Sequence, residues 1–207
     1  EGRAGHVVQA DLVAELDRLD KIVKDIKEEN YYGTPMEGFV YTTNEDAGTI
    51  MIIDYNGVKT DIVIPAEYRG YRVTAIAPGA FSGRNDITSI SIPGTVEFIE
   101  ENTFRDCTNL VSVTIGEGTC EIGDYAFSGC SSLEEIILPE SIVYIWTYAF
   151  NKCTSLTKVY FPSCLEVIEY KAFYRCENIY DVTYNGSPSE FEKIYLGNGN
   201  DPILMTD

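Results

Sequence analysis

Hydrophobic positions return along residues 80–184 with a constant step of 23 residues. Isoleucine and valine columns keep this step, and a period of about 20–29 residues without drift is typical of a solenoid. Each turn of such a coil buries its apolar side chains only against the neighbouring turns, so no single repeat is stable alone. The clearest column is phenylalanine, at Phe81, Phe104, Phe127, Phe150 and Phe173.

Within each repeat, a short segment with the pattern V-x-I alternates between apolar and polar residues. This period of two predicts a β-strand with one buried face. Strands at equivalent places in successive turns should stack in parallel, about 4.8 Å apart. The predicted strands lie near residues 62–64, 89–92, 112–115, 135–138 and 158–161.

Four cysteines form a further column, three residues after a phenylalanine. Cα atoms stacked about 4.8 Å apart are within disulfide range, but parallel Cβ vectors would keep the sulfurs from turning toward each other. We therefore prefer small, reduced, buried thiols to disulfides, and the spacing also lacks the close cysteine pairs of zinc sites. Cys120 and Cys164 fall in other columns and are expected to be unpaired. The column comprises Cys107, Cys130, Cys153 and Cys176.

The two ends of the chain depart from the repeat. Residues 11–29 have the apolar spacing of an amphipathic helix, which either covers the first coil or mediates self-association. Residues 39–43 and 49–55 predict a hairpin, and Asn56-Gly57 predicts a tight turn into the first repeat strand. Five extra residues, 68–72, lengthen the first coil. After Tyr184, a short amphipathic turn and a tight loop at 197–202 are expected to cover the last coil.

The unit resembles the BspA-type leucine-rich repeat, most clearly at residues 126–133 and 136–139. The resemblance covers about residues 61–204. It implies a right-handed leucine-rich-repeat β-solenoid with 23-residue coils, an N-terminal helix with a hairpin cap, and a short C-terminal cap. The expected parts are residues 1–37 (helix and linker), 38–60 (hairpin cap), 61–184 (repeats) and 185–207 (C-terminal cap). Arg84, Thr103 and Gly116 depart from the repeat columns and are interpreted as ordinary degeneracy.

The net charge of the chain limits the kinds of partner that it can bind. The formal net charge is −18 and the isoelectric point about 4.3, so nucleic acids and anionic membrane surfaces are poor partners. No apolar run reaches the roughly 20 residues of a membrane span. The chain begins at Glu1 without a leader, so an extracellular or cell-surface location rests on the resemblance.

Chemistry-bearing motifs are scarce. The single histidine is His6, ahead of the predicted helix, and no nucleotide-binding, nucleophile-elbow or calcium-loop motif occurs. The 33 acidic residues are scattered over turns, which favours a solvated surface over a catalytic or calcium site. We therefore predict a non-enzyme with no cofactor and no metal.

Two repeated surfaces are candidates for binding. The polar strand positions, beginning at Ser89 and Ser91, should stack into one lattice, although such a face can also serve solubility alone. A group of aromatic residues lies near the isoleucine and phenylalanine columns, although it can equally be a packing feature. Tyr125 is expected to stack against Tyr148. The lattice candidates are Ser112, Thr114, Glu135, Ile137, Lys158, Tyr160, Asp181 and Thr183, and the aromatic candidates are Tyr144, Trp146, Tyr148, Tyr170 and Tyr174.

The resemblance implies an adhesion or binding module of a bacterial surface or secreted protein. Its ligand would be a protein or a glycan outside the cell. The alternative is a structural spacer or a self-assembly module that uses the helix at residues 11–29. A monomer is expected rather than a homo-oligomer.

Overall fold

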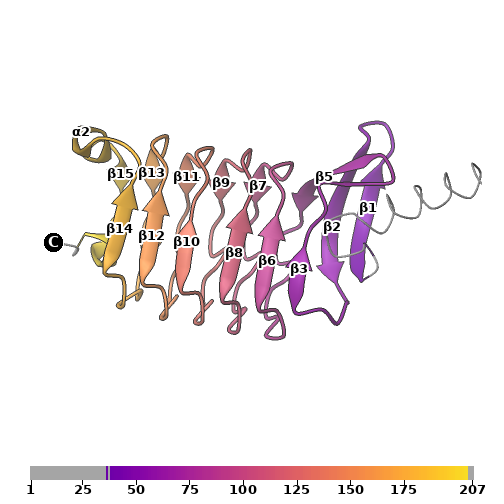
Figure 1. Cartoon of the computed structure of the whole chain (residues 1–207), viewed down its shortest axis with the longest axis horizontal. Helices are drawn as coiled ribbons and strands as arrows, with labels where there is room; N and C mark the ends of the chain where they lie inside the picture. The colour runs from indigo at the N-terminus through magenta and orange to yellow at the C-terminus, as the bar shows by residue number, and fades with distance from the viewer. Residues whose placement is uncertain (1–35, 37, 205–207) are drawn as a thin grey trace, which may run out of the picture.

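The constant step of the sequence is realised as a coil that advances along the long axis of the molecule (Figure 1). A computed structural model describes residues 36 and 38–204, so the helix predicted at residues 11–29 lies outside the described residues. From the second coil onward, each turn contributes one longer strand and one very short strand, which stack on two different sides of the coil. The predicted 23-residue coils are confirmed, because paired strands are offset by 23 residues.

The longer strands form what we call the long-strand face. The bounds of five of them agree with the sequence prediction to within one residue, because apolar side chains that face inward alternate with side chains that face outward. Hydrogen-bonded ladders join them in the orders β3-β6-β8 and β10-β12-β14, and β8 does not pair with β10. The strands are β3 (Asp61–Val63), β6 (Ser89–Ile92), β8 (Ser112–Ile115), β10 (Glu135–Ile137), β12 (Lys158–Phe161) and β14 (Asp181–Tyr184).

The second side carries one continuous ladder, the short-strand sheet, in the order β15-β13-β11-β9-β7. Each strand has only two residues, of which the second is a buried isoleucine or a partly buried leucine. Sequence reasoning identified the isoleucines as core but not as strands, since two residues are too short to show alternation. The strands are β7 (Phe98–Ile99), β9 (Glu121–Ile122), β11 (Tyr144–Ile145), β13 (Val167–Ile168) and β15 (Tyr195–Leu196).

The N-terminal end is a four-stranded sheet in the order β1-β2-β5-β4. The predicted hairpin is present as β1 (Phe39–Asn44) paired antiparallel with β2 (Thr49–Tyr55). The extra residues of the first coil form a second hairpin, β4 (Glu67–Tyr68) and β5 (Tyr71–Ile76). Its turn, Arg69-Gly70, has φ values of 52° and 84°, the positive values that a type I′ turn needs.

One prediction at this end is wrong. Asn56-Gly57 does not make a tight turn that pairs β2 with the first repeat strand. Instead β2 pairs in parallel with β5, and β3 pairs with β6, so residues 56–60 form an irregular link between two sides of the coil. Whether the hairpins protect the end of the coil as a cap stays a prediction.

At the C-terminal end, side chains take over bonds that a following coil would supply. Phe150 N donates to Ala172 O in the next coil, whereas Phe173 N donates to the side-chain Oδ1 of Asn200 at 3.0 Å. Asn200 is only 2% exposed, and its Nδ2 donates to the carbonyl oxygens of Glu169 and Gly197. The remaining elements are α2 (Pro188–Phe191) and the 3-10 helix η1 (Asp201–Ile203).

The phenylalanine column forms the centre of the core, and all five side chains are fully buried. Consecutive rings stack with centroids 5.1–5.3 Å apart and nearly parallel planes. Such offset stacking adds to the burial of apolar area that holds the coils together. Tyr55 continues the stack beyond Phe81, with centroids 6.1 Å apart.

The cysteine column is reduced and buried, as predicted. Each thiol also donates to the carbonyl oxygen of the phenylalanine of the preceding coil. For Cys107 and Phe81 the sulfur–oxygen distance is 3.0 Å, and the other three bonds measure 3.0–3.2 Å. Burial raises the pKa of Cys107 to about 12, which disfavours the thiolate there.

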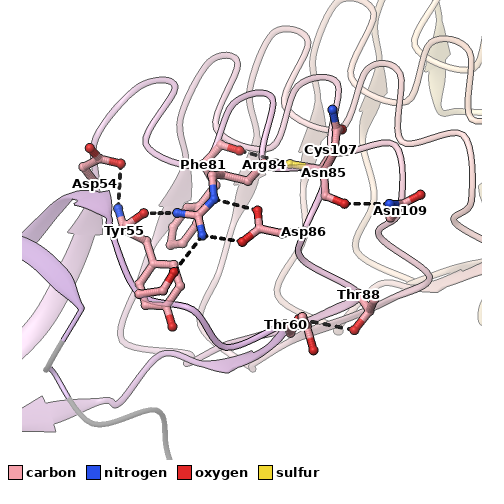
Figure 2. Close-up of polar contacts among 11 residues, drawn as sticks. Asp54, Tyr55, Thr60, Phe81, Arg84, Asn85, Asp86, Thr88, Cys107 and Asn109 are labelled. Carbon is pink, nitrogen blue, oxygen red and sulfur yellow. Dashed lines mark hydrogen bonds and ion pairs between the residues drawn. The ribbon is translucent and has the colours of Figure 1, made fainter.

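Arg84 replaces cysteine in the first coil, and this replacement is not mere degeneracy. Its guanidinium donates to the carbonyl oxygens of Tyr55 and Gly57 and pairs with Asp86 (Figure 2). The hydrogen bond between the two side chains raises the pKa of Arg84 and lowers that of Asp86. Arg84 therefore fastens the irregular link after β2 to the first repeat.

Candidate binding surfaces

The predicted lattice residues all lie on the long-strand face. The pairing register places Glu135 beside Lys158 and Lys158 beside Asp181, and it places Ile137 beside Tyr160. The column of Glu135, Lys158 and Asp181 therefore alternates in charge. The neighbouring column contains the apolar Ile137, the aromatic Tyr160 and two threonines. We call this surface, made by the eight lattice candidates Ser112, Thr114, Glu135, Ile137, Lys158, Tyr160, Asp181 and Thr183, the strand lattice.

The unpaired strands β8 and β10 open this lattice. A hollow of about 460 Å³ lies between them, and four of the lattice candidates line it. Ile137 is 58% exposed at its edge, an unusual exposure for a large aliphatic side chain. The lining residues are Ser112, Val113, Thr114, Ile115, Glu117, Glu135, Ile137, Leu138, Pro139 and Glu140.

Backbone geometry accompanies this opening. At the end of β8, Gly116 N donates to Ile92 O of the preceding coil at 2.9 Å. The turns on the other side of β8 approach each other closely. A Cβ atom added to Gly94 would lie 1.6 Å from the carbonyl oxygen of Glu117. The coils are therefore tight on one side of β8 and open on the other.

Glu140 is fixed at the rim of the hollow. One carboxylate oxygen accepts from the Asn185 side chain at 2.6 Å, and the other accepts from the hydroxyl of Ser163 at 2.9 Å. These hydrogen bonds lower the pKa of Glu140, so the carboxylate stays charged at neutral pH.

The ring contacts divide the aromatic candidates into two groups. Tyr144 and Trp146 lie on the outer side of the short-strand sheet, with ring centroids 5.9 Å apart. Trp146 Nε1 donates to the Glu121 carboxylate at 2.7 Å, which fixes the indole ring toward the preceding coil.

The other aromatic residues lie on the turns that follow the short strands. Tyr125 stacks on Tyr148 with centroids 4.9 Å apart, as predicted, and Tyr170 meets Tyr148 edge to face. The Nζ atom of Lys171 lies 4.8 Å from the ring centroids of Tyr170 and Tyr174 and 5.9 Å from that of Tyr148. We call these five residues the tyrosine ridge.

Sequence reasoning missed Lys171, although the repeat contains a signal. Lys171 occupies the position of Tyr125 and Tyr148 in the 23-residue step, and all three have φ near 55°. The hydrogen bond from Lys171 lowers the pKa of Tyr170. The ridge thus holds its own cation over its ring faces, which favours a role in packing between coils.

Metal-ligating side chains do not gather in the described part of the chain. Residues 36 and 38–204 contain no group of three or more His, Cys, Asp or Glu side chains that could hold a metal ion. No helical segment in that part has the length and apolar composition that a membrane crossing needs. His6 lies outside the described residues.

A parallel solenoid with a 23-residue step, a phenylalanine core and an exposed strand lattice defines a leucine-rich repeat protein. The family model described as the BspA type leucine rich repeat region matches residues 74–198 in six copies. This match covers more than half of the chain, so the chain belongs to the BspA-type leucine-rich repeat family.

Solved structures of bacterial proteins share the fold. A leucine rich cell surface protein from Faecalibacterium prausnitzii aligns with a TM-score of 0.67 at 26% identity, covering 84% of this chain and 53% of its own. A leucine rich repeat protein of T. pallidum aligns with a TM-score of 0.61 at 24% identity, covering 79% and 85% respectively. The chain thus spans about half of the F. prausnitzii structure. A comparison with curated proteins found no match.

Proposed function

We propose that the chain is a non-catalytic binding module of a bacterial cell-surface or secreted protein, and that the strand lattice recognises a protein or glycan outside the cell. The observation that carries this proposal is the hollow between β8 and β10, which interrupts the lattice and is lined by four of its eight residues. The name of the F. prausnitzii protein supports the location.

The composition of the lattice favours a protein ligand over a glycan. Ile137 is exposed beside the aromatic Tyr160, and the charged column alternates in sign beside them. Protein interfaces combine an apolar or aromatic centre with a polar rim, and few central residues carry most of the binding free energy. Ile137 and Tyr160 would form such a centre.

The test is a binding screen of the purified chain against extracellular-matrix proteins and glycans, followed by variants. Ile137→Asp and Tyr160→Ala are expected to weaken the binding of a lattice ligand by about fivefold or more, since a central contact contributes more than about 1 kcal/mol. Val58→Asp is the matched control, because Val58 is 93% exposed on the link between β2 and β3 and belongs to neither surface.

A ligand whose affinity is unchanged by both lattice variants would contradict the assignment of the surface. Light scattering of the same samples addresses the alternative. A stable dimer that dissociates in Leu16→Asp, with no ligand found in the screen, would favour the self-assembly module.

A further inference from the structure

A second hollow lies on the outer side of the short-strand sheet, away from the strand lattice. Its volume is about 450 Å³, and two partly exposed aromatic side chains stand at its edges. Phe98 is 41% exposed and Trp146 is 37% exposed. Four carboxylates from two successive coils complete the lining: Glu100, Glu101, Glu121 and Asp124.

The repeat itself creates this hollow. In the 23-residue step Gly123 stands between Glu100 and Trp146, so one coil lacks a side chain at this place in the column. The backbone of Gly123 packs closely against the preceding coil, and an added Cβ atom would lie 2.8 Å from the carbonyl oxygen of Ile99. Glycine therefore serves close packing and also leaves the surface open.

Trp146 is fixed in place at this hollow before any ligand arrives. Its Nε1 donates to the Glu121 carboxylate, which belongs to the preceding coil, and Tyr144 stacks against its ring. Holding an aromatic side chain in one orientation lowers the entropy lost on binding.

The charges at this hollow are unmatched within the described part of the chain. In residues 36 and 38–204 the ion pairs are Arg84–Asp86 and Arg105–Asp106, so none of the four carboxylates has a cationic partner there. Negative charge continues along the sheet at Glu166 and Glu169 in a following coil. An incoming cation would meet both carboxylates and aromatic rings, the two kinds of group that attract cations in proteins.

We propose that the outer side of the short-strand sheet docks a basic segment of a partner polypeptide and takes a lysine side chain between Phe98 and Trp146. The aliphatic part of lysine would pack on the rings while its ammonium group meets Glu121 and the other carboxylates. Because the carboxylates extend over several coils, a segment with several basic residues fits this surface better than a single small amine. This surface is separate from the strand lattice, so the two proposals can fail independently.

Trp146 provides a direct readout, because it is the only tryptophan in the chain. The full chain is titrated with an acetylated, amidated peptide that alternates lysine and glycine, while tryptophan fluorescence is recorded. A saturable change is expected, and the same peptide with glutamine in place of lysine is expected to cause none. N-acetyl-lysine amide should bind at least about tenfold more weakly than the peptide, because it meets only one part of the acidic surface.

Variants separate the hollow from the overall negative charge, with calorimetry replacing fluorescence where Trp146 is changed. Glu121→Gln keeps an oxygen that accepts from the indole but removes the charge, and its matched control is Glu134→Gln, an exposed position beside β10. Trp146→Ala removes the ring without a change of charge. Glu121→Gln and Trp146→Ala are each expected to weaken the peptide by about three- to tenfold, and Glu134→Gln by less than about twofold.

Three results would overturn the proposal. The first is equal affinity in Glu121→Gln, Trp146→Ala and Glu134→Gln, which would show attraction to net charge only. The second is binding of N-acetyl-lysine amide as tightly as the peptide, which would show that the surface does not recognise a polypeptide segment. The third is unchanged tryptophan fluorescence at peptide saturation. Thermal unfolding of each variant confirms that the coil is intact.

Discussion

The thiol of Cys130 donates a hydrogen bond to the carbonyl oxygen of Phe104, one coil earlier, at 3.2 Å. The same carbonyl also accepts from Cys107 N, so two coils meet at one oxygen atom. The cysteine column thus links each coil to the preceding one through a side chain, in addition to filling a small apolar space.

This bond predicts an order of stability at position 130. Cys130→Ala removes the donor and leaves a small cavity, and it should lower the free energy of unfolding by about 1–2 kcal/mol. Cys130→Ser keeps a donor and should lie between alanine and the wild type. Chemical denaturation measures all three, with Cys120→Ala at a less buried site as the control. An alanine variant as stable as the wild type would contradict the prediction.

The phenylalanine column predicts a larger effect. Phe127→Ala removes a fully buried ring that stacks on Phe104 and on Phe150, and it should cost about 3–5 kcal/mol of stability. Phe127→Leu retains most of the apolar volume and should cost less. Urea denaturation measures both, and Val58→Ala at the surface should change stability by no more than about 0.5 kcal/mol.

For Arg84, the contacts and the repeat pattern predict opposite effects of a substitution on stability. Arg84→Cys restores the cysteine column, yet it should destabilise the protein by about 1–3 kcal/mol, because a thiol cannot replace the bonds to Tyr55 and Gly57. Limited proteolysis should then cut within residues 56–60 faster than in the wild type. Asp86→Asn, which leaves the guanidinium bonds to the backbone in place, should have a smaller effect on cleavage.

Alkaline pH should weaken the fold through the buried thiols. Burial raises the pKa of Cys107 from its ordinary value of 9.0 to about 12. Between these values the unfolded chain loses the thiol proton while the folded chain keeps it. Deprotonation therefore favours the unfolded chain in this range. The stability that the protonated, buried thiol contributes is fully present below pH 9.0 and is lost as the pH rises toward about 12. Denaturation midpoints measured across this range should fall less steeply in Cys107→Ala than in the wild type.

The six thiols should also differ in their rate of reaction. Cys120 and Cys164 are partly exposed, whereas the four cysteines of the column are fully buried. A bulky maleimide should therefore label Cys120 quickly in the native protein, Cys164 more slowly because burial raises the pKa of its thiol, and the other four only after unfolding. Mass spectrometry of the labelled peptides identifies the sites, and rapid native labelling of Cys130 would contradict the burial of the column.

The sequence predicts those parts of the fold in which buried and exposed side chains alternate in every repeat. The long strands and the phenylalanine core are of this kind, and five repeats of the same pattern leave little ambiguity. The short strands were missed because a single isoleucine with one neighbour does not show a period. The role of Arg84 was missed because its partners, Tyr55 and Gly57, lie outside the repeat.

The candidate binding surfaces were predicted less completely. Column spacing placed the eight lattice candidates on one face, and their role in binding stays a prediction. The opening between β8 and β10 leaves the 23-residue step unchanged and therefore gives no signal in the spacing. Trp146 and Tyr148 were grouped because both lie near the isoleucine and phenylalanine columns, yet Trp146 follows a strand and Tyr148 lies in a turn with a positive φ of 57°. The partners of the two side chains therefore differ: Trp146 contacts Glu121 and Tyr144, and Tyr148 contacts Tyr125 and Tyr170.

The unpaired boundary between β8 and β10 also affects the mechanics of the coil. On the long-strand face it separates two three-stranded blocks, while the short-strand sheet runs across it without interruption. A bending motion that widens this boundary breaks fewer backbone hydrogen bonds than one that separates paired strands on the same face. Under load the molecule should therefore bend first at this boundary, as two stiff segments joined by the continuous short-strand sheet.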